Sequence, residues 1–166
     1  MEMRTMNSLF AFLLGILPIV LLGATGAGAA QVTIGAVEEV VLMPWRAKLP
    51  ARIDTGAAKS SLAARNLRIR GNVAEFRLPS KYGGLRMRLP VIEWRHIRTN
   101  VGVERRPVVE MDLCLAHMRL RTKVNLDDRI GLHYPFLVGR NTLEGNFLVD
   151  VKRSHTAPPI CGEMEQ

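Results

Sequence analysis

The residues best suited to chemistry in this chain of 166 residues form one short stretch, Arg52-Ile53-Asp54-Thr55-Gly56-Ala57. A lone carboxylate follows an apolar-tending run and precedes a small hydroxyl residue and a glycine. Such an arrangement holds a carboxyl group at the mouth of a tight turn, where it is prepared for acid/base work. An ordinary surface turn uses the same residue types, because Asp and Gly both tolerate turn geometry. The stretch alone leaves both interpretations open.

Other kinds of catalytic site find little support in the sequence. The candidate metal ligands are His96, His117, His133, His155, Cys114 and Cys161. They form neither a His-Glu-x-x-His nor a Cys-x-x-Cys pattern, so no preorganised zinc site is predicted. No Gly-x-Ser-x-Gly elbow presents a serine, and no glycine-rich phosphate loop occurs. We therefore expect no metal and no cofactor.

Hydrolysis by carboxylates alone needs two of them close together. Like charges at that distance cannot both ionise, so the pair shares one proton. The remaining aspartates (Asp112, Asp127, Asp128 and Asp150) are not followed by Thr or Ser and Gly. One chain thus supplies one suitable carboxylate. A dyad requires a twofold-symmetric homodimer in which the two copies of Asp54 meet on the axis.

The elements that position Asp54 are predicted to be strands, because period-two alternation dominates the sequence. Residues 85–89 and 118–126 alternate most clearly, and residues 32–35 and 39–43 are interpreted as an opening pair. Residues 98–106 predict a projecting hairpin, and Ala116-His117 predicts a hairpin tip. Helix is expected only as a turn at residues 60–65 and a short segment at residues 140–144. These features predict an all-β domain, a small closed or sandwich-like barrel.

The first 30 residues differ in kind from the rest. Arg4 precedes an apolar run from Leu9 to Leu22, and small residues follow up to Ala30. This pattern predicts a secretory signal peptide (residues 1–30), with residues 31–166 as the mature domain. A retained membrane anchor is the alternative, although the apolar run is shorter than the roughly 20 residues that a spanning helix needs. We expect a periplasmic or secreted protein that has no membrane contact after cleavage.

The expected location outside the cytoplasm affects how the net charge and the two cysteines are interpreted. The formal charge of +8 favours an acidic partner, although a basic surface without a partner is an equal alternative. Export argues against nucleic acid. Cys114 and Cys161 form an even pair in an oxidising compartment, so a disulfide that pins the carboxyl-terminal tail is one possibility. Sequence does not establish that their Cα atoms approach closely enough.

Two motifs carry a resemblance to a known family. Arg52 to Ala57 resembles the active-site loop of retropepsin-like aspartic proteases, and Phe136-Leu137-Val138-Gly139-Arg140-Asn141 resembles their second signature. The longer set adds Ser60-Ser61-Leu62, Asp128-Arg129, Tyr134, Leu143 and Phe147 to Asp150. It resembles the bacterial retropepsin-like group that has been labelled ATP-dependent zinc proteases. The resemblance spans about residues 34 to 154 and implies a small closed barrel of the retropepsin type.

The resemblance also implies roles for individual residues. Asp54 is the catalytic carboxylate, Thr55 hydrogen-bonds across the dyad, and Gly56 lets the backbone approach the carboxylates. Ala57 belongs to the same loop. Gly139 is expected to pack behind it, and Arg140 to stabilise the loop or the dimer through a carboxylate pair.

The projecting hairpin is the natural candidate for a flap that closes over substrate, with Asn100, Val101 and Gly102 at its tip.

This chain also departs from the group. Ala58-Lys59 stands where Arg-Thr is usual, and Ala63 stands where His is common. These changes leave the dyad untouched but put substrate contacts of those side chains in doubt. Nothing in the sequence supports the zinc or ATP in the group's label.

Two functions follow. The first is a homodimeric aspartic endopeptidase acting on peptides, with acidic, glutamate-rich peptides as one candidate class, because relatives trim such peptides and the cleft would be basic. The second is a non-catalytic exported binding or scaffold domain that retains the fold. A metallopeptidase is a distant third.

Overall fold

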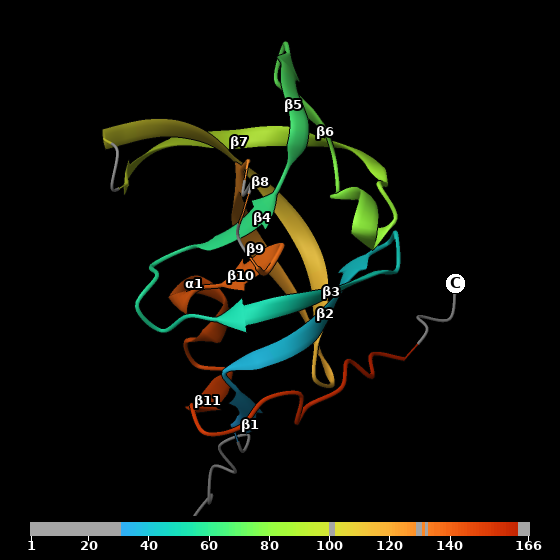
Figure 1. Ribbon diagram of the computed structural model, residues 1–166, viewed down its shortest axis with the longest axis vertical. Coiled ribbons are helices and arrows are strands. Elements are labelled where there is room, and N and C mark those ends of the chain that lie inside the picture. The colour runs from blue at the N-terminus through green and yellow to red at the C-terminus, as the bar shows by residue number, and fades with distance from the viewer. Residues whose placement is uncertain (1–30, 100–101, 129–130, 132, 163–166) are drawn as a thin grey trace, which may run out of the picture.

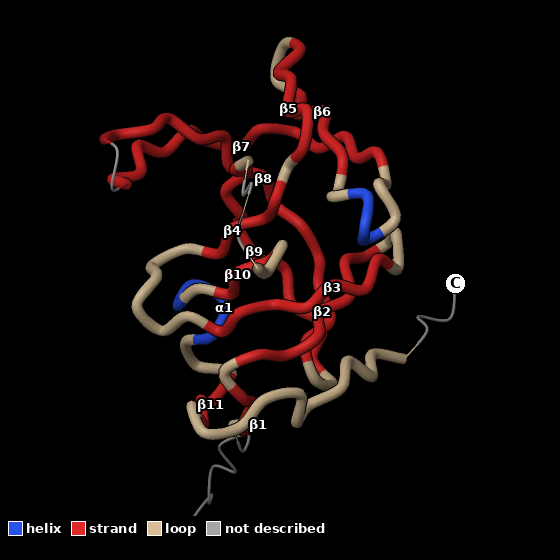
Figure 2. Tube along the Cα trace, viewed as in Figure 1, coloured by secondary structure: helices blue, strands red, loops and turns tan. Residues whose placement is uncertain are grey.

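Strands make up almost all of the regular structure, with two short helical turns (Figure 2). The structure is a computed structural model that describes residues 31–99, 102–128, 131 and 133–162. The strands are β1 (Val32–Gly35), β2 (Val37–Met43), β3 (Ala47–Ile53), β4 (Ser60–Ala63), β5 (Arg65–Arg70), β6 (Val73–Arg77), β7 (Arg86–Thr99), β8 (Gly102–Leu115), β9 (Met118–Asp127), β10 (Phe136–Val138) and β11 (Phe147–Asp150). The helical turns are η1 (Ser80–Tyr82) and α1 (Arg140–Leu143). The predicted all-β class is confirmed.

Six strands close into a ring in the order β2, β3, β10, β4, β9 and β8. The pairing of β2 with β8 closes it, running from Val40 opposite Leu115 to Met43 opposite Asp112. Strands β7, β6 and β5 continue from β8 as an open extension, which Figure 1 draws across the top of the molecule. The closure predicted from the sequence is therefore limited to the six-stranded ring.

The alternation along β9 shows how sequence builds this ring. Thr122, Val124 and Leu126 are buried, whereas the arginines between Met118 and Thr122 point to solvent. Large core side chains are fully enclosed, among them Phe76, Leu42, Leu62, Leu113 and Phe136. Each such burial contributes about 1.5–3 kcal/mol to folding. The period-two pattern thus fixes which face of each strand lines the core.

The first strand does not pair as the sequence suggested. β1 lies parallel to β11, with Val32 opposite Phe147, in a separate two-stranded sheet. β2 pairs with β3 and β8 instead, so the expected opening pair is wrong. Alternation identifies a strand but carries no information on its partner, which here comes from the other end of the chain.

The turn expected at residues 60–65 is also wrong, because residues Ser60–Ala63 form strand β4. All four residues are buried between β10 and β9. The sequence offered this segment as one of two places for a helical turn. In the fold, tertiary hydrogen bonds satisfy the buried hydroxyl of Ser60, so a strand can carry it into the core.

The predicted hairpins are present. β7 and β8 form a long antiparallel hairpin that ends with Thr99 opposite Gly102. The predicted tip residues Asn100 and Val101 lie outside the described residues, as do residues 1–30, where a signal peptide is predicted. The turn at Ala116-His117 joins β8 to β9. In the described part of the chain, no helix is long and apolar enough to cross a membrane.

The carboxyl-terminal segment is attached to the sheet at two points. Cys114 of β8 and Cys161 form a disulfide with a Cα–Cα distance of 5.9 Å. The possibility raised by the sequence is therefore realised. The buried carboxylate of Glu38 holds the segment further upstream, accepting hydrogen bonds from the backbone N–H groups of Gly35, Thr156 and Ala157.

Candidate active site

The carboxylate of Asp54 is fixed by its own turn. Asp54 follows the last residue of β3, and its N–H donates to the carbonyl of Val138 at 2.9 Å. Its Oδ1 accepts hydrogen bonds from the N–H groups of Gly56 at 2.9 Å and Ala57 at 3.1 Å. These donors fix the orientation of the carboxylate through Oδ1 and leave Oδ2 available to another group.

Gly56 is closely fitted to this carboxylate. A Cβ at Gly56 would lie 3.2 Å from Asp54 Oδ1, which is tighter than an ordinary contact. Thr55 and Gly56 are both exposed at the tip of the turn. The hydrogen bond expected from Thr55 across a dyad would require a second copy of the chain, and it stays a prediction.

Gly139 lies directly behind the Asp54 loop. A Cβ at Gly139 would lie 2.5 Å from the carbonyl carbon of Lys59 and 2.9 Å from the nitrogen of Ser60. Its backbone N–H donates to Ser60 Oγ at 3.0 Å. The position thus admits no side chain unless the chain after Asp54 moves.

The side chain of Arg140 holds the backbone of the Asp54 turn. Its Nη1 donates to the carbonyl oxygens of Thr55 at 2.9 Å and Gly56 at 2.8 Å. Arg140 therefore supports the loop through backbone carbonyl groups and not through the expected carboxylate, whereas a carboxylate contact across a dimer stays a prediction.

Sequence reasoning gave no role to Asn141, which ties the loop to the ring. Its Oδ1 accepts from Ser60 N at 2.7 Å, and its Nδ2 donates to Thr122 Oγ1 at 2.8 Å and to the Lys123 carbonyl at 2.9 Å. Hydroxyl contacts of 2.8 Å continue from Ser60 to Thr142 and on to Thr122. The sequence feature that could have identified Asn141 is its position directly after Gly139-Arg140.

A cluster of charges links the end of the loop to β7 and β9, and it consists of Glu93 and Arg95 of β7, Lys123 of β9 and Lys59, which precedes β4. The hydrogen bond from Arg95 lowers the pKa of Glu93, and the charges of Arg95, Lys123 and Lys59 lower it further. Burial opposes this shift. Three cations thus surround one carboxylate. Lys59 is one of the residues by which this chain departs from the group pattern.

The predicted site residues fall into two sets. Asp54, Thr55, Gly56, Ala57, Gly139 and Arg140 come together in one hydrogen-bonded unit. Gly102 begins β8 at the end of the long hairpin, which Figure 1 draws on the same side as the loop after β3. Within the described ranges, no three His, Cys, Asp or Glu residues form a group that could hold a metal ion.

A protein-family model described as "Retropepsin-like aspartic endopeptidase RimB" matches residues 33–159. The chain belongs to this family. The match contains both the Asp54 turn and the Gly139 stretch behind it. The resemblance inferred from those two motifs is therefore confirmed.

Two relatives extend the comparison. A protein of unknown function from Legionella pneumophila has a crystal structure that matches with a TM-score of 0.68 and 29% identity, covering 77% of this chain and 99% of that one. A protein of Parasynechococcus marenigrum named "Probable alpha-L-glutamate ligase" is 32% identical over 116 residues. That match covers 64% of this chain and 25% of the relative, so the chain spans about a quarter of that protein's length.

Proposed function

We propose that this protein is an aspartic endopeptidase whose catalytic dyad consists of Asp54 from each of two subunits. The observation that carries the proposal is the Asp54 turn, in which two N–H groups orient the carboxylate and Gly139 and Arg140 support the backbone. Family membership supports the same activity.

The other described aspartates are engaged elsewhere, which supports a dyad built from two chains. Asp112 pairs with Arg121 and Arg119, Asp127 with Arg106, and Asp128 with Arg65, and Asp150 accepts from Lys152 N–H. In the proposed mechanism, one Asp54 carboxylate takes a proton from water as the water attacks the peptide carbonyl. The protonated carboxyl group of the other Asp54 donates to the carbonyl oxygen. The C–N bond then breaks as the amine takes the proton held by the first carboxyl group, and a hydroxyl group of the tetrahedral intermediate returns its proton to the second, which restores the dyad.

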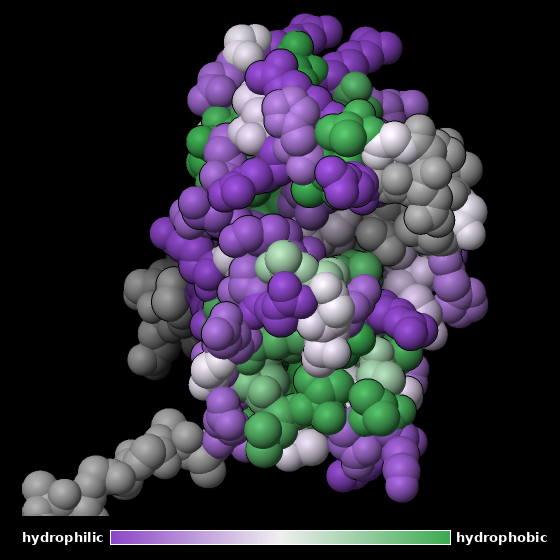
Figure 3. Space-filling model, turned by 90° about the vertical axis from the view of Figure 1, so that its left-hand side faces the viewer, coloured by the Kyte–Doolittle hydropathy of each residue, from purple (hydrophilic) through white to green (hydrophobic). Residues whose placement is uncertain are grey.

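A surface for the second subunit is available at β11. In the described chain β11 pairs on one edge with β1, and Leu148 and Val151 are 54% and 75% exposed. Hydrophobic side chains gather on the lower part of the side shown in Figure 3, at the level of β1 and β11 in Figure 1. We propose that two copies pair here about a twofold axis on which their Asp54 loops also meet.

Acidic, glutamate-rich peptides are the proposed substrate class. Positive charge is in excess near the Asp54 loop, because three cations (Lys59, Arg95 and Lys123) accompany one carboxylate there. The relative named "Probable alpha-L-glutamate ligase" also suggests glutamate as the residue that is recognised. A glutamate peptide should therefore have a higher kcat/KM than its glutamine isostere, and the difference should shrink as salt is raised.

The decisive experiment compares Asp54→Asn with Asp112→Asn, an aspartate engaged by arginines on β9. Asp54→Asn should abolish peptide hydrolysis while keeping the dimer, whereas Asp112→Asn should keep both. Wild-type and Asp54→Asn subunits are then mixed in equal amounts and allowed to exchange. The mixture should have about one quarter of the activity of wild type at the same total protein concentration, because only one dimer in four has two intact subunits. If each subunit acted alone, about one half would remain. Wild-type hydrolysis by Asp54→Asn would refute the mechanism.

A non-catalytic binding domain is the second candidate. The replacement of the group's usual residues by Ala58, Lys59 and Ala63 favours it. A strictly monomeric protein that binds acidic peptides without cleaving them would support this function instead.

A further inference from the structure

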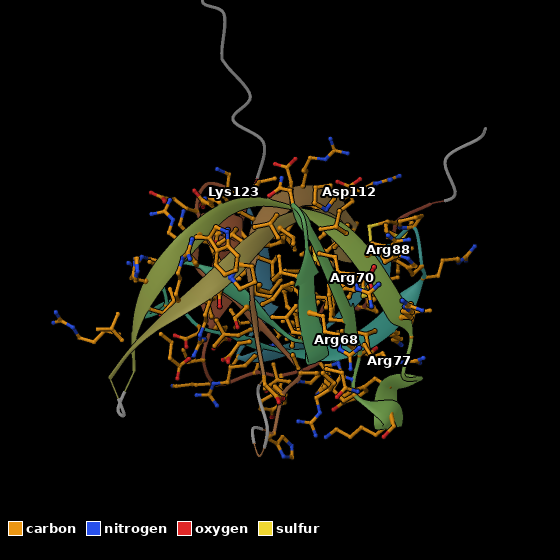
Figure 4. The ribbon with its side chains drawn as sticks, turned by 90° about the horizontal axis from the view of Figure 1, so that it is seen from above. Arg68, Arg70, Arg77, Arg88, Asp112 and Lys123 are labelled. Atoms are coloured by element: carbon orange, nitrogen blue, oxygen red, sulfur yellow. A yellow bond between two sulfur atoms is a disulfide. The ribbon has the colours of Figure 1, made fainter. Side chains whose placement is uncertain are left out.

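We propose that a basic face on β5, β6 and β7, separate from the Asp54 site, binds an extended acidic segment of polypeptide. The arginine face consists of Arg68, Arg70, Arg77, Arg86 and Arg88. Figure 1 draws the β5–β6 hairpin at the top, away from the end of β3. Four labelled arginines of this face lie on one side of the molecule in Figure 4, and Lys123 lies on another. The inference goes beyond the proposed catalysis and does not depend on it.

Strand pairing brings these side chains together. Arg68 lies opposite Glu75 on β6, and Glu75 lies opposite Arg88 on β7. One step along, Arg77 lies directly opposite Arg86. Like charges facing each other across strands destabilise a sheet. The arrangement therefore favours an anion that would neutralise the face.

Glu75 shows what these guanidinium groups can bind. Its carboxylate is nearly buried and contacts Arg86 at 3.1 Å, Arg88 at 3.2 Å and Arg70 at 3.9 Å. The hydrogen bond from Arg86, against some burial, lowers the pKa of Glu75, and the charges of Arg88 and Arg70 lower it further. One carboxylate cannot neutralise three cations, so the outward N–H groups remain able to bind further carboxylates.

A hollow of about 400 Å³ lies on this face. It is lined by Asn66, Arg68, Arg70, Glu75, Phe76, Arg77 and Arg86. The four lining arginines and one glutamate give a net charge of +3 (4 − 1). Arg68 has no ion pair with any residue in the described ranges. The hollow is thus open and cationic, and its rim includes a guanidinium group that lacks a carboxylate partner.

The chemistry of the face favours a polypeptide. The single lining aromatic, Phe76, is 2% exposed, so the hollow offers no platform on which nucleobases could stack. Side chains on one face of a strand recur about every 7 Å, which matches alternate carboxylates of an extended acidic chain. β5 ends the described sheet, so its outer edge can pair with such a chain through the backbone.

The test uses the full chain with Asp54→Asn, so that the ligand is not cleaved. A fluorescent oligoglutamate of about ten residues is titrated by anisotropy, since that length spans the face at about 3.4 Å per residue. Arg68→Gln/Arg77→Gln removes two cations and leaves all three contacts of Glu75 intact. Arg119→Gln/Arg121→Gln is the control, because it also removes two arginines, here from β9, where both pair with Asp112.

We expect the first pair to weaken binding by about 10-fold and the control pair by less than about 2-fold. Hydrogen exchange should show that oligoglutamate protects the amides of β5 and β6. Arg68→Gln/Arg77→Gln should abolish this protection, and the unfolding temperature of this variant should equal that of the parent protein.

Equal weakening by both pairs, or no change with either, would overturn the inference. In that case the arginines serve only to keep an edge strand from pairing. Tighter binding of a single-stranded oligonucleotide of equal length, lost in Arg68→Gln/Arg77→Gln, would assign the face to nucleic acid instead. None of these outcomes bears on whether Asp54 is catalytic, because hydrolysis is measured separately.

Discussion

Replacing Gly139 by alanine tests whether this glycine supports the Asp54 loop. The new Cβ would lie 2.5 Å from the Lys59 carbonyl carbon, whereas ordinary contacts begin at 3.4 Å, so the Lys59–Ser60 backbone must move by 0.9 Å (3.4 − 2.5). That movement would stretch the bonds from Ser60 N to Asn141 Oδ1 at 2.7 Å and from Arg140 N to the Ala57 carbonyl at 2.9 Å. Both bonds hold the chain that follows the catalytic carboxylate.

The cost can be worked out from these contacts. Overpacking of this kind costs about 1–3 kcal/mol, and the loss of one buried hydrogen bond adds about 1 kcal/mol. A total of about 2–4 kcal/mol lowers the unfolding temperature of a domain of this size by roughly 10 °C. A displacement near 1 Å at a catalytic group reduces kcat/KM by about 100-fold.

The assay combines thermal unfolding by circular dichroism with peptide hydrolysis at a temperature where the variant is folded. Gly162→Ala is the matched control, because a Cβ there would meet nothing within 4 Å. If Gly139→Ala unfolds and cleaves like Gly162→Ala, the argument that Gly139 supports the site is refuted.

Two further predictions concern the carboxyl-terminal segment. Both carboxylate oxygens of Glu38 accept hydrogen bonds, so the N–H₂ group of Glu38→Gln would face another donor, either Ala157 N–H or those of Gly35 and Thr156. The free energy of unfolding at pH 7 should therefore fall by about 1.5–3 kcal/mol. Burial alone would raise the pKa of Glu38, but the hydrogen bonds outweigh it and the pKa is lowered. Stability from the charged form is therefore lost as pH falls below 4.5 and through the folded-state pKa, and urea unfolding curves of wild type and variant should converge in acid. A constant difference between pH 7 and 3.5 would contradict this reasoning. Cys161→Ser opens a loop with a sequence separation of 47 residues, which should lower the free energy of unfolding by about 2–4 kcal/mol, and reductant should bring the wild type to the same urea midpoint. An unchanged midpoint would show that the bridge restrains only the tail.

Several features could be read from the sequence because their signals are local. The alternation at residues 118–126 predicts a half-buried strand, and β9 is one. The short helix expected after Gly139 appears as α1. The Asp54 turn and the Gly139 stretch were identified separately, and in the fold β3 and β10 lie side by side, with Ile53 opposite Val138.

Other features were missed because they depend on contacts between distant parts of the chain. Residues 60–65 were expected to form a turn, but Ser60–Ala63 pair with β9 and β10 as a buried strand. Arg140 was expected to bind a carboxylate, but the fold places its guanidinium group against two backbone carbonyl groups. The partner of a long side chain is set by what the tertiary structure brings within reach.

The sequence by itself determined the strand-rich class and the lone Asp-Thr-Gly turn, since both follow from residue types and short-range spacing. The glycine behind that turn was expected only from the family resemblance. Only the tertiary structure decided that β1 pairs with β11, that Cys114 reaches Cys161, and that three arginines from β5 and β7 contact Glu75. Strand register and long-range partners are chosen by the packing of the whole domain, because the hydrophobic effect rewards burial without specifying which distant segment supplies it.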